Sequence, residues 1–171
     1  MSADAVMPVS VVIERRETDN QWDDHLWRPV GVLPRADLEP GKMLAEGEGW
    51  AQYYGGVLDI ELYRGETDGY RTNLSQDTPL VYVVLRRSAD AEVLEFEPFM
   101  VTACPYEAMS YSEGNDDVVE GVPMPPEIVT WVREFVALHH VDVPFKKRKN
   151  KRHEDDYGGK QSQAERERDM S

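Results

Sequence analysis

The stretch GVLDIELYR at residues 56–64 alternates apolar and polar side chains. Its apolar positions are Leu58, Ile60 and Leu62, and its polar positions include Asp59 and Glu61. Because successive side chains of a β-strand point to opposite faces, this period of two predicts a strand with one buried face and one solvated, acidic face. Asp59 and Glu61 share the acidic face, so they are candidate contacts for a positively charged partner.

A second stretch, LVYVVL at residues 80–85, is apolar without interruption. Such a run is typical of a central strand that is covered on both faces. The turn-like residues 66–69 connect strand 56–64 to the segment 70–74, and together they predict a β-hairpin. Residues 37–49 are rich in Gly and Pro and are expected to form a loop. Further strands are predicted at residues 9–14, 27–33, 93–96, 99–103 and 118–122, and a short helix at 105–114.

A longer helix is predicted at residues 127–140, where apolar side chains recur at helical spacing. Pro126 precedes it, and proline is favoured at the first helical position because its missing N–H has no helical partner there. Glu127 in the first turn and His139 in the last turn both suit the helix dipole.

These elements predict a mainly β, β-rich α+β fold. We expect an antiparallel sandwich or partial barrel of roughly six to eight strands, with one C-terminal helix packed on it. Residues 1–7 are expected to be a disordered N-terminus, and residues 8–145 to form a single acidic domain. Residues 146–171 contain no Val, Ile, Leu, Phe or Trp, so this tail is expected to be disordered.

Charge is distributed very unevenly along the chain. Residues 1–145 carry a net charge of −17, whereas residues 146–171 carry +3. The tail opens with a basic block of six cations, Lys146, Lys147, Arg148, Lys149, Lys151 and Arg152. The acidic domain favours a basic protein partner and repels phosphate backbones, so nucleic acid is an unlikely partner for it. High negative charge can also serve solubility alone.

No motif in the chain identifies a reaction. Cys104 is the single cysteine, which excludes an internal disulfide, and the four histidines lack the spacing of a shared metal site. Glycine-rich phosphate loops are absent, so we expect no cofactor, no metal and no catalytic residue. Adjacent carboxylates such as Glu95 and Glu97 are expected to lie on a solvated face. No stretch is apolar over the roughly 20 residues of a membrane span, and no signal peptide is recognisable, so a cytoplasmic location is expected.

Several short elements resemble those of a known family: WRPVGVL at 27–33, YRTNL at 70–74, PLVYVVLR at 79–86, VPMPP at 122–126, Trp131 with Phe135, and FKKRK at 145–149. Together they are similar to an uncharacterised family of short proteobacterial proteins over residues 8–149. The resemblance implies a genomic association with molybdenum-containing formate dehydrogenase. It supplies no catalytic or ligand-binding residues.

The first functional hypothesis is therefore a non-enzymatic accessory protein for formate dehydrogenase maturation. Its acidic surface, including Asp59 and Glu61, would hold a basic client segment, such as an arginine-rich export signal or another part of a formate dehydrogenase subunit. The alternative is a nucleic-acid-associated regulator that binds through Lys146–Arg152. A third hypothesis is a small hydrolase or transferase that uses Cys104 or a carboxylate pair. The oligomeric state stays open.

Overall fold

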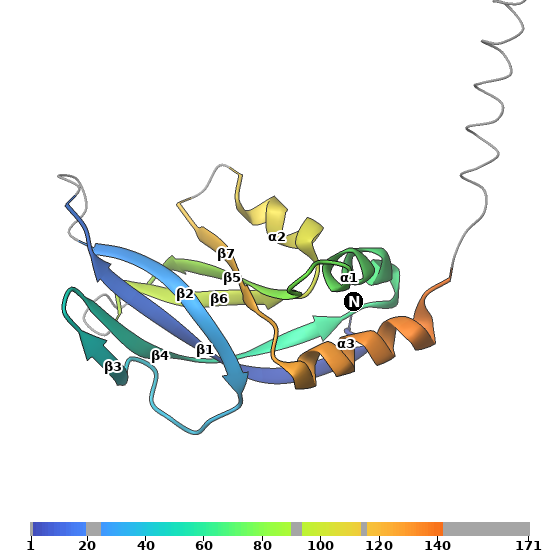
Figure 1. Cartoon of the computed structure of the whole chain (residues 1–171), viewed down its shortest axis with the longest axis horizontal. Helices are drawn as coiled ribbons and strands as arrows, with labels where there is room; N and C mark the ends of the chain where they lie inside the picture. Colours follow the sequence, from blue (N-terminus) through green and yellow to red (C-terminus); the bar gives the residue numbers. More distant parts are fainter. Residues whose placement is uncertain (1, 20–24, 90–93, 114–115, 142–171) are drawn as a thin grey trace, which may run out of the picture. The chain divides into compact units, whose positions relative to one another are not determined.

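The computed structural model describes residues 2–19, 25–89, 94–113 and 116–141. Within these residues the protein forms two antiparallel sheets and three α-helices (Figure 1). The predicted mainly β, α+β class is confirmed. The strands are β1 (Ala5–Glu17), β2 (His25–Pro34), β3 (Met43–Gly47), β4 (Trp50–Leu62), β5 (Leu80–Arg87), β6 (Phe96–Thr102) and β7 (Val118–Pro123). The helices are α1 (Thr67–Leu74), α2 (Pro105–Tyr111) and α3 (Pro126–His139), with a 3-10 turn, η1 (Arg64–Glu66), before α1.

The larger sheet has the strand order β2-β1-β4-β3, and the smaller sheet has the order β6-β5-β7. The sheets approach each other closely where β4 meets β6, because a Cβ atom on Gly55 would lie 2.7 Å from Cγ of Pro98. A second contact joins β2 to β7, where Arg28 forms an ion pair with Glu120 at 3.2 Å. No ladder of hydrogen bonds links the two sheets in the described part of the chain, so they form a sandwich rather than a closed barrel.

The two stretches that predicted the sheets behave as expected. In β5, Val83, Val84 and Leu85 are fully buried, which fits a central strand covered on both faces. In β4, Ile60 and Leu62 are fully buried, whereas the intervening Asp59 and Glu61 are exposed. The strand itself begins earlier than predicted, at Trp50, because its first half pairs with β1 and β3.

The C-terminal helix α3 lies within one residue of its predicted bounds. It buries Ile128, Val132 and Phe135 against the body of the domain, and the ring of Phe135 meets Tyr70 edge-on at a centroid distance of 6.1 Å. The short helix predicted after residue 104 and the strand predicted near 118–122 are also present, as α2 and β7.

The predicted hairpin at residues 56–74 is wrong. Residues 64–74 form η1 and α1 instead of a turn and a strand. Two side chains explain the helix. Tyr70 is fully buried, and its hydroxyl accepts from the backbone N–H of Tyr63 at 2.9 Å and donates to Oε2 of Glu66 at 3.2 Å. Asn73 donates to the carbonyls of Leu80 and Ala103 and accepts from the N–H of Leu80. These non-local bonds override the local strand preference.

Three smaller expectations also need correction. The expected loop at 37–49 contains β3, which pairs with β4. The two strands expected around Pro98 are a single strand, β6, because a register shift at Val84/Leu85 of β5 accommodates the proline. Finally, β1 begins at Ala5, inside the segment expected to be disordered, because Ala5 pairs with Leu62.

All four edge strands of the two sheets carry an irregularity. A register shift interrupts β3 between Met43 and Ala45. Each of the other edges contains proline: β2 at Pro29 and Pro34, β6 at Pro98, and β7 at Pro123. Proline cannot donate to a ladder and is therefore largely confined to edges and bulges.

Two candidate cavities of opposite character

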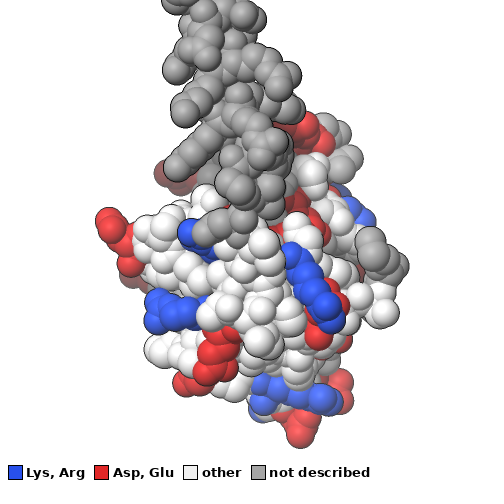
Figure 2. Space-filling view, turned by 90° about the vertical axis from the view of Figure 1, so that its right-hand side faces the viewer, with Lys and Arg blue, Asp and Glu red and all other residues white. Residues whose placement is uncertain are grey.

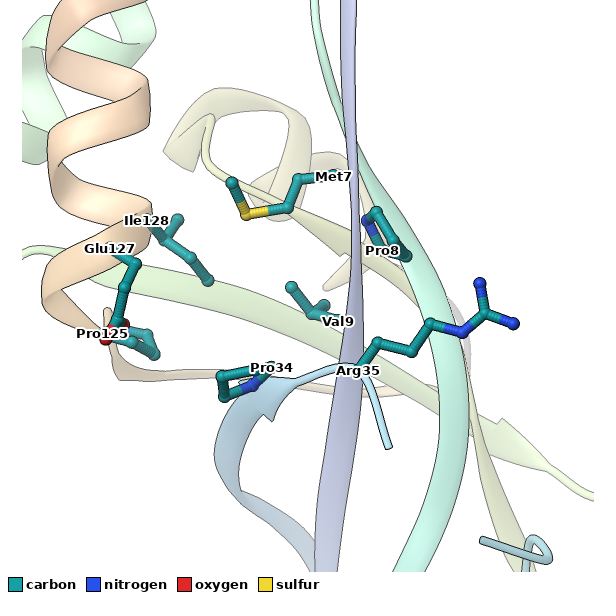
Figure 3. A pocket seen from close by; sticks show the side chains of 8 residues that line it. All are labelled: Met7, Pro8, Val9, Pro34, Arg35, Pro125, Glu127 and Ile128. Atoms are coloured by element: carbon teal, nitrogen blue, oxygen red, sulfur yellow. The ribbon is translucent and has the colours of Figure 1, made fainter. Parts of the chain in front are cut away.

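An apolar cavity of about 290 Å³ lies where β1, the end of β2 and the start of α3 meet. Its lining residues are Met7, Pro8, Val9, Pro34, Arg35, Pro125, Glu127 and Ile128. In Figure 3 the side chains of Met7, Val9 and Ile128 point toward one another across the cavity, whereas the guanidinium of Arg35 extends away from it. This cavity suits an apolar group, and it presents little polar chemistry.

Prolines explain why this cavity exists. The ladder between β1 and β2 ends at the pair Val9 and Pro34, and Pro8 has its partner, Asp59, on β4. Since neither proline has a backbone N–H, the ladder is not continued past this point. The first turn of α3 then covers the gap through Ile128.

A second and more open cavity, of about 400 Å³, lies between α1 and α2, and its lining includes three acidic residues beside apolar surface. Its lining residues are Gly65, Glu66, Asp68, Gly69, Cys104, Tyr106, Glu107 and Ser110. We refer to it as the acidic cavity. The two helices approach closely because Gly69 has no side chain: a Cβ atom there would lie 2.5 Å from Sγ of Cys104. Glycine at this position therefore lets the two helices pack closely enough for acidic residues of both to line the same cavity.

The carboxylates of the acidic cavity influence one another. Burial raises the pKa of Glu66, and the negative charge of Glu107 raises it further. The neighbouring Tyr63 has its pKa raised to about 12, first because its hydroxyl donates to Glu61 at 2.7 Å and further because Glu107 and Glu66 lie nearby. The acidic cavity therefore carries negative charge that no positively charged side chain in its described lining neutralises.

The arginines of the same segment are engaged outside the lining. Arg64 forms an ion pair with Asp4 at 3.3 Å, and Arg71 donates to Nε2 of His140 at 2.6 Å. His140 also approaches Asp68, with Nδ1 and Oδ1 3.8 Å apart. Among the described residues, no lysine or arginine lines the acidic cavity.

Cys104 lines the acidic cavity but is a poor candidate nucleophile. Burial raises the pKa of its thiol more than the backbone amides of Glu107 and Tyr106 lower it, and both Glu66 and Glu107 raise it as well. A nucleophilic cysteine needs the opposite shift, because the thiolate is the reactive form. The cavity does place Cys104 beside two carboxylates, but its lining, among the described residues, contains no histidine or lysine to act as a base and no arginine to stabilise a thiolate.

The residues predicted from the sequence lie in different places. Glu61 is exposed on β4 and accepts from the hydroxyl of Tyr63 at 2.7 Å, but neither residue lines the acidic cavity. Asp59 is exposed on β4 and lines neither of the two cavities. The basic block Lys146–Arg152 lies outside the described residues. Glu95 accepts from Nε1 of Trp27 at 3.0 Å, and Glu97 accepts from Ser88 at 3.3 Å, so this pair contributes to packing and surface contacts.

Sequence reasoning missed Glu66, Asp68 and Glu107 as a group. About forty residues separate the first two from Glu107, and the segment that holds Glu66 and Asp68 was expected to be a hairpin turn. The residues meet because Gly69 lets α1 pack against Cys104, the residue before α2. To find this group from the sequence, residues 67–74 would first have had to be predicted as a helix.

Other features of the described residues are less informative about function. No group of three or more His, Cys, Asp and Glu side chains is arranged to hold a metal ion there. None of the helices in the described ranges combines the length and the apolar character needed to cross a membrane. On the face of the molecule in Figure 2, acidic and basic side chains are interspersed among uncharged ones. Despite the net negative charge of the chain, this face is therefore not uniformly acidic.

Comparison with known proteins identifies the family. Residues 8–149 match a family described as "Protein of unknown function (DUF3305)". The chain belongs to this family, and the expected resemblance to a family of unknown function over these residues is confirmed. Searches of curated proteins and of solved structures give no match.

Proposed function

We propose that this member of the DUF3305 family is a non-enzymatic accessory protein that holds a basic segment of a client protein. The observation that carries the proposal is the acidic cavity, which brings Glu66, Asp68 and Glu107 together without a lysine or arginine in its described lining. A cationic side chain entering it would form charge-assisted hydrogen bonds. It would also relieve the repulsion that raises the pKa of Glu66.

The proposed client is a formate dehydrogenase, through an arginine-rich export signal or another basic segment of one of its subunits. This part of the proposal rests on the resemblance to proteins whose genes are associated with that enzyme. We include Glu61 in the proposed binding surface because it accepts from Tyr63, whose pKa is raised in part by the charges of Glu66 and Glu107. Asp59, two residues earlier on the same face of β4, would contribute a longer-range attraction.

A binding experiment tests the site. The purified full-length chain is titrated with the basic segment of the client as a synthetic peptide, by calorimetry, at about 50 mM and 300 mM salt. We expect binding that weakens with salt. Glu107→Gln should weaken it roughly five- to tenfold, because one charge-assisted contact is lost. The matched control is Glu48→Gln, the same change in the exposed turn between β3 and β4. Equal effects of both substitutions would contradict the site.

A genetic experiment tests the client. Deleting the gene in its native host should lower formate dehydrogenase activity, and the wild-type gene should restore it while Glu107→Gln restores it only in part. Normal activity in the deletion strain would contradict the proposed role. The nucleic-acid alternative depends on Lys146–Arg152 and stays a prediction, because that block lies outside the described residues.

A further inference from the structure

We infer that the acidic cavity selects arginine over lysine, an inference that rests on the proposed function and specifies its ligand. The geometry points to this choice because the lining combines carboxylates with an exposed aromatic ring, that of Tyr106. A planar guanidinium can use both kinds of contact at once, whereas an ammonium behaves as a compact, strongly hydrated charge.

The ring of Tyr106 is held in place. Its hydroxyl lies 3.2 Å from Oγ1 of Thr72 on α1, and its edge lies over Gly69, where a Cβ atom would be 3.4 Å from Cδ2 of the ring. Nevertheless 58% of Tyr106 remains exposed. A fixed and exposed aromatic ring beside a cavity offers a guanidinium a stacking surface without the cost of ordering the ring.

Acidic residues of two neighbouring segments line the cavity, and two of them also have partners within the protein: Glu66 accepts from the hydroxyl of Tyr70 at 3.2 Å, and Asp68 lies 3.8 Å from Nδ1 of His140. Glu66 and Asp68 belong to the start of α1, and Glu107 belongs to the first turn of α2. A guanidinium has five N–H donors spread in a plane, so it can contact carboxylates of both helices while it stacks on Tyr106. A lysine ammonium has three donors at a single point and gains little from the ring at an exposed site.

The protein contains the same combination elsewhere. Arg86 lies over the ring of Phe99, with its Cζ 3.6 Å from the ring centroid. It also donates from Nε and Nη2 to the two carboxylate oxygens of Asp117, at 3.1 and 2.9 Å. This site shows, within one side chain, the ring and carboxylate contacts that we propose for a client arginine in the acidic cavity.

The test compares three synthetic peptides that differ at one residue only: arginine, lysine or citrulline, which is neutral and close in shape to arginine. Each is titrated into the full-length chain under identical salt. We expect the arginine peptide to bind roughly five- to tenfold more tightly than the lysine peptide, and the citrulline peptide to bind most weakly. Tyr106→Leu should reduce the ratio between arginine and lysine to about one, with lysine binding nearly unchanged.

Tyr106→Phe is the matched variant, because it keeps the ring and loses only the hydroxyl contact with Thr72. It should keep most of the preference for arginine, and circular dichroism should show both variants folded. If arginine and lysine peptides bind equally well and Glu107→Gln weakens both, the inference is overturned while the proposed function stands. If no cationic peptide binds, both are overturned.

Discussion

Strand β5 and helix α1 are neighbours in the chain, yet different forces hold them. β5 is stabilised by apolar burial on both faces, with Val83, Val84 and Leu85 fully buried. The helix α1 is positioned by polar contacts, above all those of Asn73 with Leu80 and Ala103. The difference teaches that the sheet core follows from local sequence pattern, whereas the acidic cavity depends on a few specific hydrogen bonds.

The largest expected loss of stability comes from a substitution in the apolar core around β5. Leu85→Ala removes a fully buried side chain from the central strand and leaves a cavity, so it should lower the free energy of unfolding by about 3 kcal/mol. Urea denaturation followed by circular dichroism measures the change. The control is Leu138→Ala on α3, where the leucine is 77% exposed; a loss of similar size there would contradict the argument from burial.

A smaller loss of stability is expected when the hydrogen bonds that position α1 are removed. Asn73→Ala removes its bonds to Leu80 and Ala103 and leaves their buried backbone groups without these partners, at a cost of about 2 kcal/mol. Because α1 carries Asp68 and is capped by Glu66, binding of an arginine peptide should also weaken. The neighbouring Thr72→Ala, at an exposed position, is the stability control. An Asn73→Ala variant as stable as wild type would show that apolar packing of Tyr70 alone positions α1.

The smallest effect concerns the charge within the acidic cavity. The pKa of Glu66 is raised above its ordinary value of 4.5 by burial and by Glu107, so the folded state disfavours its ionised form. Glu66→Gln should therefore increase the free energy of unfolding at pH 7, by less than about 1 kcal/mol because the site is partly solvated.

This difference between Glu66→Gln and wild type should shrink as the pH falls through the raised pKa and vanish below about 4.5, where Glu66 is protonated in both the folded and unfolded states. Urea unfolding of both proteins at pH 7 and pH 4 measures it. Glu48→Gln, the same change in the exposed turn between β3 and β4, is the control. A variant less stable than wild type at pH 7 would contradict the assigned repulsion.

The same contrast explains what could be predicted from the sequence. Strands with a clear apolar pattern, at 56–62 and 80–85, and the amphipathic helix near 127–140 were identified correctly, because burial imposes a period on the sequence. Segment 64–74 was mistaken for a hairpin, because its helix depends on contacts with residues far along the chain, that of the Tyr70 ring with Phe135 and that of Asn73 with Ala103.

The candidate site was less predictable than the fold. Asp59 and Glu61, which were proposed from the sequence for their place on a strand face, do not line the acidic cavity. Glu66 and Glu107 have nothing in their local sequence to distinguish them among 33 acidic residues. Their meeting follows from the close packing of Gly69 on Cys104, which is a property of three-dimensional structure.

The interrupted edge strands have a consequence for how this protein behaves at high concentration. An uninterrupted edge would offer its free N–H and C=O groups to an identical molecule and start a growing fibre. The prolines of β2, β6 and β7 and the irregular register of β3 interrupt that template on each of the edge strands in the described part of the chain. Addition of a further strand, from a second copy or from another chain, is thereby disfavoured at these edges.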